Sequence, residues 1–181
     1  MVSRRRSRRP LRFLTLAALA IGAGWASCFR LNLSASSPAG VYFLIPVQLS
    51  RPLERGDLVL ACPPRPVAKI GRAHGYLHFG LCPGLVPELL KPVEAVPGDR
   101  VAVQNFFVVI NQQPVPGALL LPRDSGGRPL TPFSPHELEV PADSLFLLST
   151  HSPRSWDSRY FGPVPLAAVR ARAVPLWRFA P

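Results

Sequence analysis

Leu89-Leu-Lys-Pro-Val-Glu-Ala-Val-Pro-Gly-Asp-Arg-Val-Ala-Val103 is the stretch from which the fold can be inferred. Its two ends are extended, valine-rich segments, and Pro97-Gly-Asp99 between them is a turn sequence. The same arrangement occurs upstream, where the turn Arg55-Gly-Asp57 leads into the apolar run Leu58–Cys62. Short extended segments joined by tight turns are typical of all-β folds that are mostly antiparallel, so both stretches predict this class of structure.

Working outward, further apolar runs predict short strands at 40–45, 106–110, 145–149 and within 167–174. The run 106–110 is followed by Asn111-Gln-Gln-Pro114, which predicts a hairpin. The 23 prolines argue against long helices after the N-terminal segment. We expect 63–88 to be an irregular excursion and 114–141 a loop with little regular structure. The predicted fold class is all-β, mostly antiparallel, behind one N-terminal transmembrane helix.

The N-terminus predicts a membrane anchor. A basic arm over 1–12 precedes seventeen uncharged residues, 13–29, which is about the shortest length that spans a bilayer. By the positive-inside rule, the arginines before this segment place the N-terminus inside and the domain 30–181 outside the membrane. Three other interpretations stay open: a twin-arginine export signal, a lipoprotein cleavage site at Cys28, and cleavage after a small residue near Ala26. An uncleaved anchor contacting the lipid bilayer is preferred.

The charge pattern argues against nucleic-acid binding. The net charge is +11, but six of the basic residues lie within the first twelve positions. The remaining chain has fifteen basic residues against ten acidic ones, with no basic stripe. We therefore expect no nucleic-acid partner. The hydrophobic fraction of 48% is sufficient for a packed core, so a globular domain is expected.

The cysteines indicate a disulfide rather than a metal site. Cys62 and Cys82 lie beyond the anchor, in a compartment that is oxidising, so we expect them to be joined. Cys28 belongs to the apolar segment. His74 and His78 could complete a metal site only if 71–80 were helical, and the glycines there argue against a helix. No metal and no cofactor is predicted.

Two residue types suggest hydrolytic chemistry. Among 21 basic residues only Lys69 and Lys91 are lysines. Arginine stays ionised, whereas burial can make a lysine neutral, and a neutral amine is a base. Upstream, Asn32-Leu-Ser-Ala-Ser-Ser-Pro-Ala-Gly-Val-Tyr42 is a serine-dense turn that can present a nucleophile. Serine and an unprotonated lysine form a complete hydrolytic pair.

Three motifs in order carry a resemblance. They are Ser36-Ser-Pro-Ala-Gly-Val-Tyr42, Lys91 six residues before Pro97-Gly-Asp99, and Ser155-Trp-Asp-Ser-Arg-Tyr-Phe-Gly-Pro163. With them the chain resembles the type I signal peptidase family of membrane-anchored serine–lysine proteases, and more narrowly the TraF-type peptidases of conjugative transfer systems. The resemblance runs from about Arg30 to Val174, nearly the whole exported part. It implies a single-pass protein of a bacterial inner membrane, with a cytoplasmic N-terminus and a periplasmic catalytic domain.

The resemblance implies a role for each site residue. Ser36 would be the nucleophile and Lys91 the general base, and the hydroxyl of Ser34 would join the Ser36 backbone N–H in binding the oxyanion. Ser155 would hydrogen-bond and orient the Lys91 amine. Two further residues, Asp157 and Arg159, would pair structurally beneath the site.

Each of these features alone has a structural explanation. Ser34, Ser36 and Ser37 could simply be turn residues. Lys91 could be a strand-edge lysine that prevents aggregation, and Asp157-Ser-Arg159 an exposed ion pair. No packing argument requires all of them at this spacing, so the catalytic interpretation is preferred.

Two departures from the wider family bear on the substrate. Ser37 follows the nucleophile where housekeeping enzymes usually carry methionine, and Ser149-Thr-His-Ser152 stands where they have a Gly-Asp-Asn-Arg run. Both favour the conjugative branch, whose implied substrate is a membrane-delivered pilin precursor. Only six residues separate Phe29 from Ser36, so the nucleophile is expected close to the bilayer. A housekeeping signal peptidase and a non-catalytic assembly protein of a conjugation channel remain the alternatives.

Overall fold

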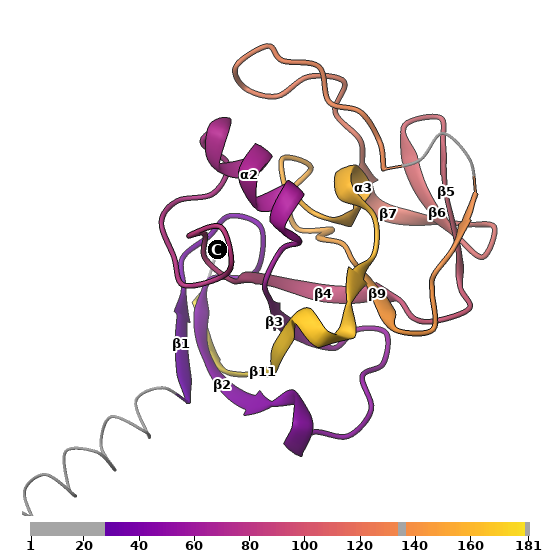
Figure 1. Cartoon of the computed structure of the whole chain (residues 1–181). Coiled ribbons are helices and arrows are strands. Elements are labelled where there is room, and N and C mark those ends of the chain that lie inside the picture. Colours follow the sequence, from indigo (N-terminus) through magenta and orange to yellow (C-terminus); the bar gives the residue numbers. More distant parts are fainter. Residues whose placement is uncertain (1–27, 134–136, 180–181) are drawn as a thin grey trace, which may run out of the picture.

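The computed structural model describes residues 28–133 and 137–179, which form two antiparallel sheets (Figure 1). The larger sheet has seven strands in the order β1-β2-β11-β3-β4-β9-β10, and the smaller has four in the order β7-β6-β5-β8. The predicted mostly antiparallel β-fold is confirmed. The predicted anchor 13–29 falls almost wholly outside the described residues. Within the described ranges, no helix combines the length and hydropathy needed to traverse a bilayer.

The strands of the larger sheet are β1 (Phe29–Asn32), β2 (Gly40–Pro46), β3 (Leu58–Ala61), β4 (Leu89–Ala95), β9 (Ser144–Leu147), β10 (Val164–Pro165) and β11 (Val169–Arg178). The smaller sheet contains β5 (Arg100–Gln104), β6 (Phe107–Ile110), β7 (Gln113–Leu119) and β8 (Leu138–Glu139). Among the described residues, the helices are α2 (Arg65–Ala73) and α3 (Ser158–Phe161), with 3₁₀ turns at Val47–Leu49 and Leu166–Ala168.

The Pro97-Gly-Asp99 turn carries the chain from β4 in one sheet to β5 in the other. Gly98 has φ +83°, a left-handed conformation that favours glycine. The Asp99 carboxylate accepts hydrogen bonds from the Val96 backbone N–H at 2.8 Å, Arg55 Nε at 2.9 Å and Asn111 Nδ2 at 2.9 Å. These contacts fix the turn and therefore the position of β4 between its neighbours.

The last strand lies in the interior of the larger sheet. Residues near 167–174 were expected to close a sheet, but β11 extends to Arg178 and lies between β2 and β3. Strand β4 is also interior, between β3 and β9, with Lys91 directly opposite Val59. The strand-edge explanation for Lys91 is therefore wrong.

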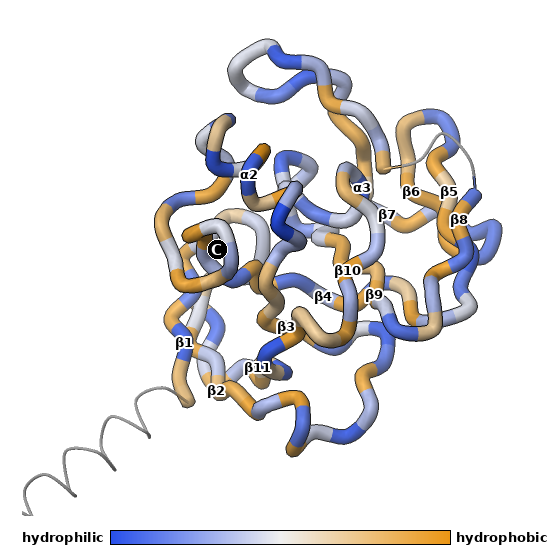
Figure 2. Tube along the Cα trace, in the orientation of Figure 1, coloured by the Kyte–Doolittle hydropathy of each residue, from blue (hydrophilic) through white to orange (hydrophobic). Residues whose placement is uncertain are grey.

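Both faces of the larger sheet are covered. Val59 packs with Val93 and Leu145 in one apolar cluster, whereas the adjacent Leu60 packs with Leu90 in another. Since successive strand residues point to opposite faces, these clusters lie on the two sides of the sheet. A third cluster joins β5, β6 and β7 to β9 and α3. Figure 2 shows the corresponding hydrophobic colour along β9 and β10.

The 63–88 segment is less irregular than expected. Pro64 is the N-cap of α2 and Pro66 lies in the first turn, where proline lacks only an N–H that would have no helical partner. The prolines therefore start a helix instead of preventing one. The helix ends before Gly75, which has φ +75°, so 71–80 is not a continuous helix.

The 114–141 segment also contains a strand that was not expected. Strand β7 includes Pro114 and Pro116. It is the edge strand of the smaller sheet, and an edge strand tolerates residues that cannot donate on its outer side. The prediction of a loop was wrong here because position in a sheet is not visible in the local sequence.

Cys62 and Cys82 form a disulfide with an S–S distance of 2.01 Å and a sequence separation of 20. Both sulfur-bearing residues are buried beneath α2, in a cluster with Ala68, Leu77 and Val86. The bond ties the loop that follows α2 to the end of β3. This loop forms part of the wall of the cavity described below.

Candidate active site

Ser36 lies in the loop that connects β1 to β2. The loop is anchored to β4 because Ser37 Oγ donates a hydrogen bond to the Leu90 backbone oxygen at 2.7 Å. Tyr42 Oη donates to the Pro38 backbone oxygen at 2.6 Å, which fixes the return of the chain into β2. At the start of β2, a Cβ on Gly40 would lie 2.3 Å from the Trp177 backbone oxygen, so the close approach of β11 requires glycine.

The Asn32 side chain occupies the inside of the same loop. Asn32 Nδ2 donates to the backbone oxygens of Ser37 at 3.1 Å and Pro38 at 3.0 Å. Asn32 Oδ1 accepts from the Ser34 hydroxyl at 2.8 Å and from the Ser34 backbone N–H at 3.3 Å. One buried amide therefore joins both limbs of the loop around Ser36.

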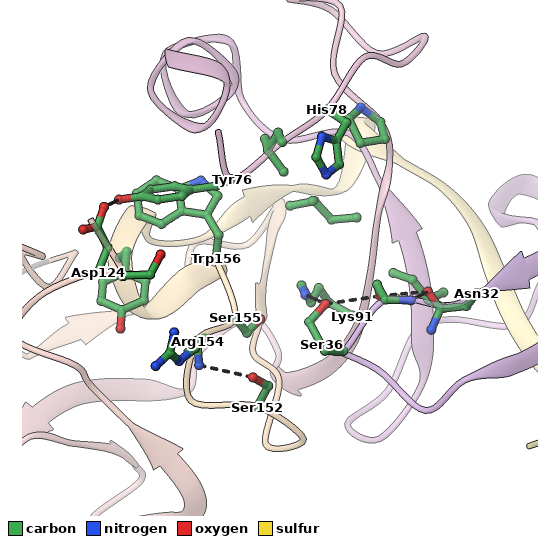
Figure 3. Close-up of a pocket in the computed structure, with 18 of the residues that line it drawn as sticks. Asn32, Ser36, Tyr76, His78, Lys91, Asp124, Ser152, Arg154, Ser155 and Trp156 are labelled. Carbon is green, nitrogen blue, oxygen red and sulfur yellow. Dashed lines mark hydrogen bonds between the residues drawn. The ribbon is translucent and has the colours of Figure 1, made fainter. Parts of the chain in front are cut away.

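Lys91 and Ser36 point toward one another (Figure 3). Lys91 Nζ lies 2.5 Å from Ser36 Oγ, and the lysine is only 3% exposed. Burial lowers the pKa of Lys91 from 10.5 to about 8, with Asp157 raising it and Arg159 lowering it by smaller amounts. General-base activation of a serine requires its hydroxyl to contact a base of about this pKa, and Ser36 and Lys91 meet this requirement.

Ser34 lies next to Ser36, and the Oγ atoms of the two serines are 3.4 Å apart. Its only hydroxyl proton is engaged by Asn32 Oδ1. The side chain lines the same cavity as Ser36, so a molecule bound in that cavity against Ser36 would also lie near the Ser34 hydroxyl.

Ser155 lies in the cavity wall with Lys91, but the expected hydrogen bond between them is not formed in this structure. Ser155 is 2% exposed, and its Oγ has no hydrogen-bond partner among the described residues. The hydrogen bond of Lys91 goes to Ser36 instead. A buried hydroxyl without a partner costs about 1–3 kcal/mol, and such groups concentrate at functional sites.

Asp157 and Arg159 form a fully buried ion pair rather than an exposed one. Arg159 Nε and one terminal nitrogen contact the two carboxylate oxygens at 2.8 and 3.0 Å, and both side chains are 0% exposed. The pair also holds the main chain of Ser149, because Asp157 accepts from the Ser149 N–H at 3.1 Å and Arg159 donates to the Ser149 carbonyl oxygen. Ser149 Oγ in turn donates to the Ser36 carbonyl oxygen at 2.5 Å. The ion pair therefore acts on the nucleophile's backbone through one intermediate serine.

The dyad opens into a cavity of about 620 Å³. Figure 3 shows Ser36, Lys91 and Asn32 on one side of it and Tyr76 with Asp124 on the other. Tyr76 donates to the Asp124 carboxylate, which holds the pKa of Asp124 well below its usual range. The hydrogen bond from Tyr76 to Asp124 holds the loop 121–130 against the segment after α2. This loop is mostly hydrophilic (Figure 2). The cavity is therefore walled by parts of the chain far apart in sequence.

Sequence reasoning missed four residues that shape the site: Asn32, Ser149, Tyr76 and Asp124. Asn32 could have been found, because asparagine two residues before a serine commonly accepts from that serine's backbone N–H in a turn. Ser149 was noted only as a departure from the family pattern. Tyr76 and Asp124 had no local signal, since they meet across 48 residues of chain.

The model of the family described as signal peptidase, peptidase S26, matches residues 9–177 of this chain. A probable conjugal transfer protein TraF of Sinorhizobium fredii is 43% identical over 187 residues, covering 100% of this chain and 96% of that protein. A plasmid transfer protein TraF of Escherichia coli is 34% identical over 149 residues, covering 82% of each. Signal peptidase I of Bacillus caldolyticus is 33% identical over 89 residues, covering 45% of this chain and 49% of that protein.

Proposed function

This chain belongs to the signal peptidase S26 family, and on that premise we propose that it is a serine–lysine endopeptidase acting in conjugative transfer. The observation that carries the proposal is the 2.5 Å contact between Ser36 Oγ and a buried Lys91 Nζ whose pKa is lowered to about 8. At neutral pH a measurable fraction of such a lysine is already a neutral base.

The geometry supports a two-step acyl transfer. Ser36 Oγ attacks the carbonyl carbon of the scissile peptide bond while its proton passes to Lys91 Nζ. The tetrahedral oxyanion receives hydrogen bonds from the Ser36 backbone N–H and the Ser34 hydroxyl. Its collapse breaks the C–N bond, and Lys91 returns the proton to the departing amine. Water then hydrolyses the ester on Ser36, with Lys91 again accepting and returning a proton.

The Ser155 hydroxyl, in the cavity wall with Lys91, can take part in this reaction. Its buried Oγ has no hydrogen-bond partner in the part of the chain that the structure describes, so it can accept from the Lys91 ammonium that forms during the reaction. In that role it orients the base only after proton transfer. Asp157 and Arg159 support the site indirectly by holding Ser149 against the nucleophile's backbone.

The proposed substrate is a pilin-type precursor delivered from the membrane. The two relatives that match over most of their length are named as a probable conjugal transfer protein and a plasmid transfer protein, which favours this substrate over general preproteins. Apolar side chains are exposed on β1, on the loop that carries Ser36 and on the neighbouring β11, namely Leu31 at 57%, Leu33 at 71% and Trp177 at 68%. Such a surface fits a domain that lies on the periplasmic face of the inner membrane, held there by the predicted anchor 13–29.

The test is mass spectrometry of a candidate pilin precursor co-expressed with the full chain in membranes. We expect cleavage after a small residue by the wild type and by Lys69→Arg, because Lys69 lies exposed on α2. Lys91→Arg should not cleave, because arginine keeps its proton and cannot act as the base. Near-normal cleavage by Lys91→Arg would refute the serine–lysine mechanism.

The same preparation separates the alternatives. Cleavage of secreted preproteins but not of the pilin would assign the chain to housekeeping signal peptidase activity. No cleavage of either substrate, with no labelling of Ser36 by a serine-directed probe, would identify a non-catalytic assembly protein.

A further inference from the structure

The Ser34 hydroxyl has one proton, and in this structure that proton is committed. Ser34 Oγ donates to Asn32 Oδ1 at 2.8 Å, whereas Ser36 Oγ is 3.4 Å away. To donate to an oxyanion, the hydroxyl must rotate away from Asn32. Asn32 Oδ1 would then retain only the longer bond from the Ser34 backbone N–H, at 3.3 Å.

This exchange favours the transition state over the bound substrate. A neutral peptide carbonyl offers the Ser34 proton a bond no stronger than the one it already makes to a neutral amide oxygen. A tetrahedral oxyanion offers a charge-assisted bond, which is roughly twice as strong. The Ser34 hydroxyl therefore changes its hydrogen-bond acceptor, from Asn32 Oδ1 to the oxyanion, only when negative charge develops. An interaction made only in the transition state raises kcat rather than substrate affinity.

We propose that Asn32 is a positioning residue for oxyanion stabilisation: its amide oxygen holds the Ser34 proton until charge develops, and its amide nitrogen fixes the loop that presents Ser36. The inference rests on the proposed peptidase function. Asn32 is 7% exposed, and both ends of its amide are engaged, by Ser34 and by the main chain at Ser37 and Pro38, so it acts through these groups.

Asn32→Asp tests the proposal with little change in size. The carboxylate still accepts the Ser34 proton but binds it more tightly, and its charge opposes the oxyanion. We expect kcat for the pilin precursor to fall by about 10–100-fold with KM within about threefold. Asn105→Asp is the matched control, since Asn105 lies exposed in the turn between β5 and β6, and it should behave as wild type.

A double-mutant cycle with Ser34→Ala separates this role from a purely structural one. If Asn32 acts partly through Ser34, Asn32→Asp should lower kcat by a clearly smaller factor when Ser34 is already alanine. The loss of the Nδ2 bonds to Ser37 and Pro38 and the added charge act in both backgrounds, so a part of the loss should remain. Equal losses in both backgrounds would overturn the proposal. A wild-type enzyme that cleaves no substrate would instead refute the proposed peptidase function, so the two failures are distinguishable.

A second measurement needs no change at Asn32 and remains informative if Asn32→Asp does not fold. The asparagines of the chain are Asn32, Asn105 and Asn111, so asparagine-selective nitrogen-15 labelling resolves their side-chain amides. A peptide aldehyde, to which Ser36 Oγ adds with transfer of its proton to Lys91, should shift the Asn32 amide signal. A non-cleavable peptide should not. An unchanged Asn32 signal in the aldehyde adduct would overturn the proposal.

Discussion

Replacing Lys91 by methionine should make the protein more stable at neutral pH and abolish its activity. In the folded state the Lys91 pKa is about 8, whereas the unfolded chain has the ordinary value of 10.5. The unfolded state therefore binds a proton more readily than the folded state between these pH values, and stability contributed by this group rises with pH. Below about pH 8 the folded protein carries the full penalty of a buried ammonium.

The magnitude follows from the two pKa values. At about 1.4 kcal/mol per pH unit, the difference between 10.5 and about 8 amounts to about 3 kcal/mol. Lys91→Met removes this penalty, so its advantage over wild type should be largest near pH 7. About 2 kcal/mol of that advantage should disappear between about pH 7 and pH 9.5, as the wild-type lysine loses its proton.

The assay is urea unfolding of the full chain in detergent at several pH values, comparing each variant with wild type so that all other titrations cancel. Lys69→Met, at an exposed position on α2, is the control and should show no such trend. A difference between Lys91→Met and wild type that stays constant with pH would refute the lowered pKa. The same ionisation should appear in kcat/KM, which we expect to rise about tenfold from pH 7 to 9 and then level off.

Three further outcomes are expected. Ser34→Ala should lower kcat by about 10–1,000-fold with little change in KM, and Ser36→Ala should remove essentially all activity. Steady-state kinetics check both; an unchanged kcat in Ser34→Ala would show that Ser34 does not stabilise the oxyanion. Peptide mapping without reductant should recover Cys62 joined to Cys82, and replacing both by alanine should lower the unfolding free energy by about 3 kcal/mol; two free thiols would contradict this. Asp157→Asn should destabilise by about 3–5 kcal/mol because its arginine partner stays buried without a counter-charge, and an unchanged urea midpoint would show that the pair is not needed.

Local patterns predicted most of the strands correctly. Pro97-Gly-Asp99 and Arg55-Gly-Asp57 both form turns, because glycine can adopt the positive φ that each turn uses, a property of the residue itself. The apolar runs that follow these turns form β3 and β5 as expected. The errors fell where the same residues are compatible with two structures: Pro66 begins α2, and Pro116 lies within an edge strand.

The candidate dyad could be named from the sequence, but its chemistry could not. The order of the motifs was enough to identify the family and to single out Ser36 and Lys91. Whether Lys91 is neutral at working pH depends on burial, and burial depends on β4 lying between β3 and β9. The hydrogen bonds from Ser149 to Ser36 and from Ser34 to Asn32 likewise depend on coordinates rather than on residue type.

The sequence by itself therefore determined the antiparallel β-class, the family and the residues with the right functional groups, because turn chemistry and motif order are local properties. The tertiary structure decided which strands are neighbours, how deeply Lys91 is buried and which proton each hydroxyl donates. Those properties arise from strand pairings between segments far apart in the chain, such as β11 with β2 and β3. Such pairings are selected by the packing of the whole domain, so they cannot be predicted from a short stretch of sequence.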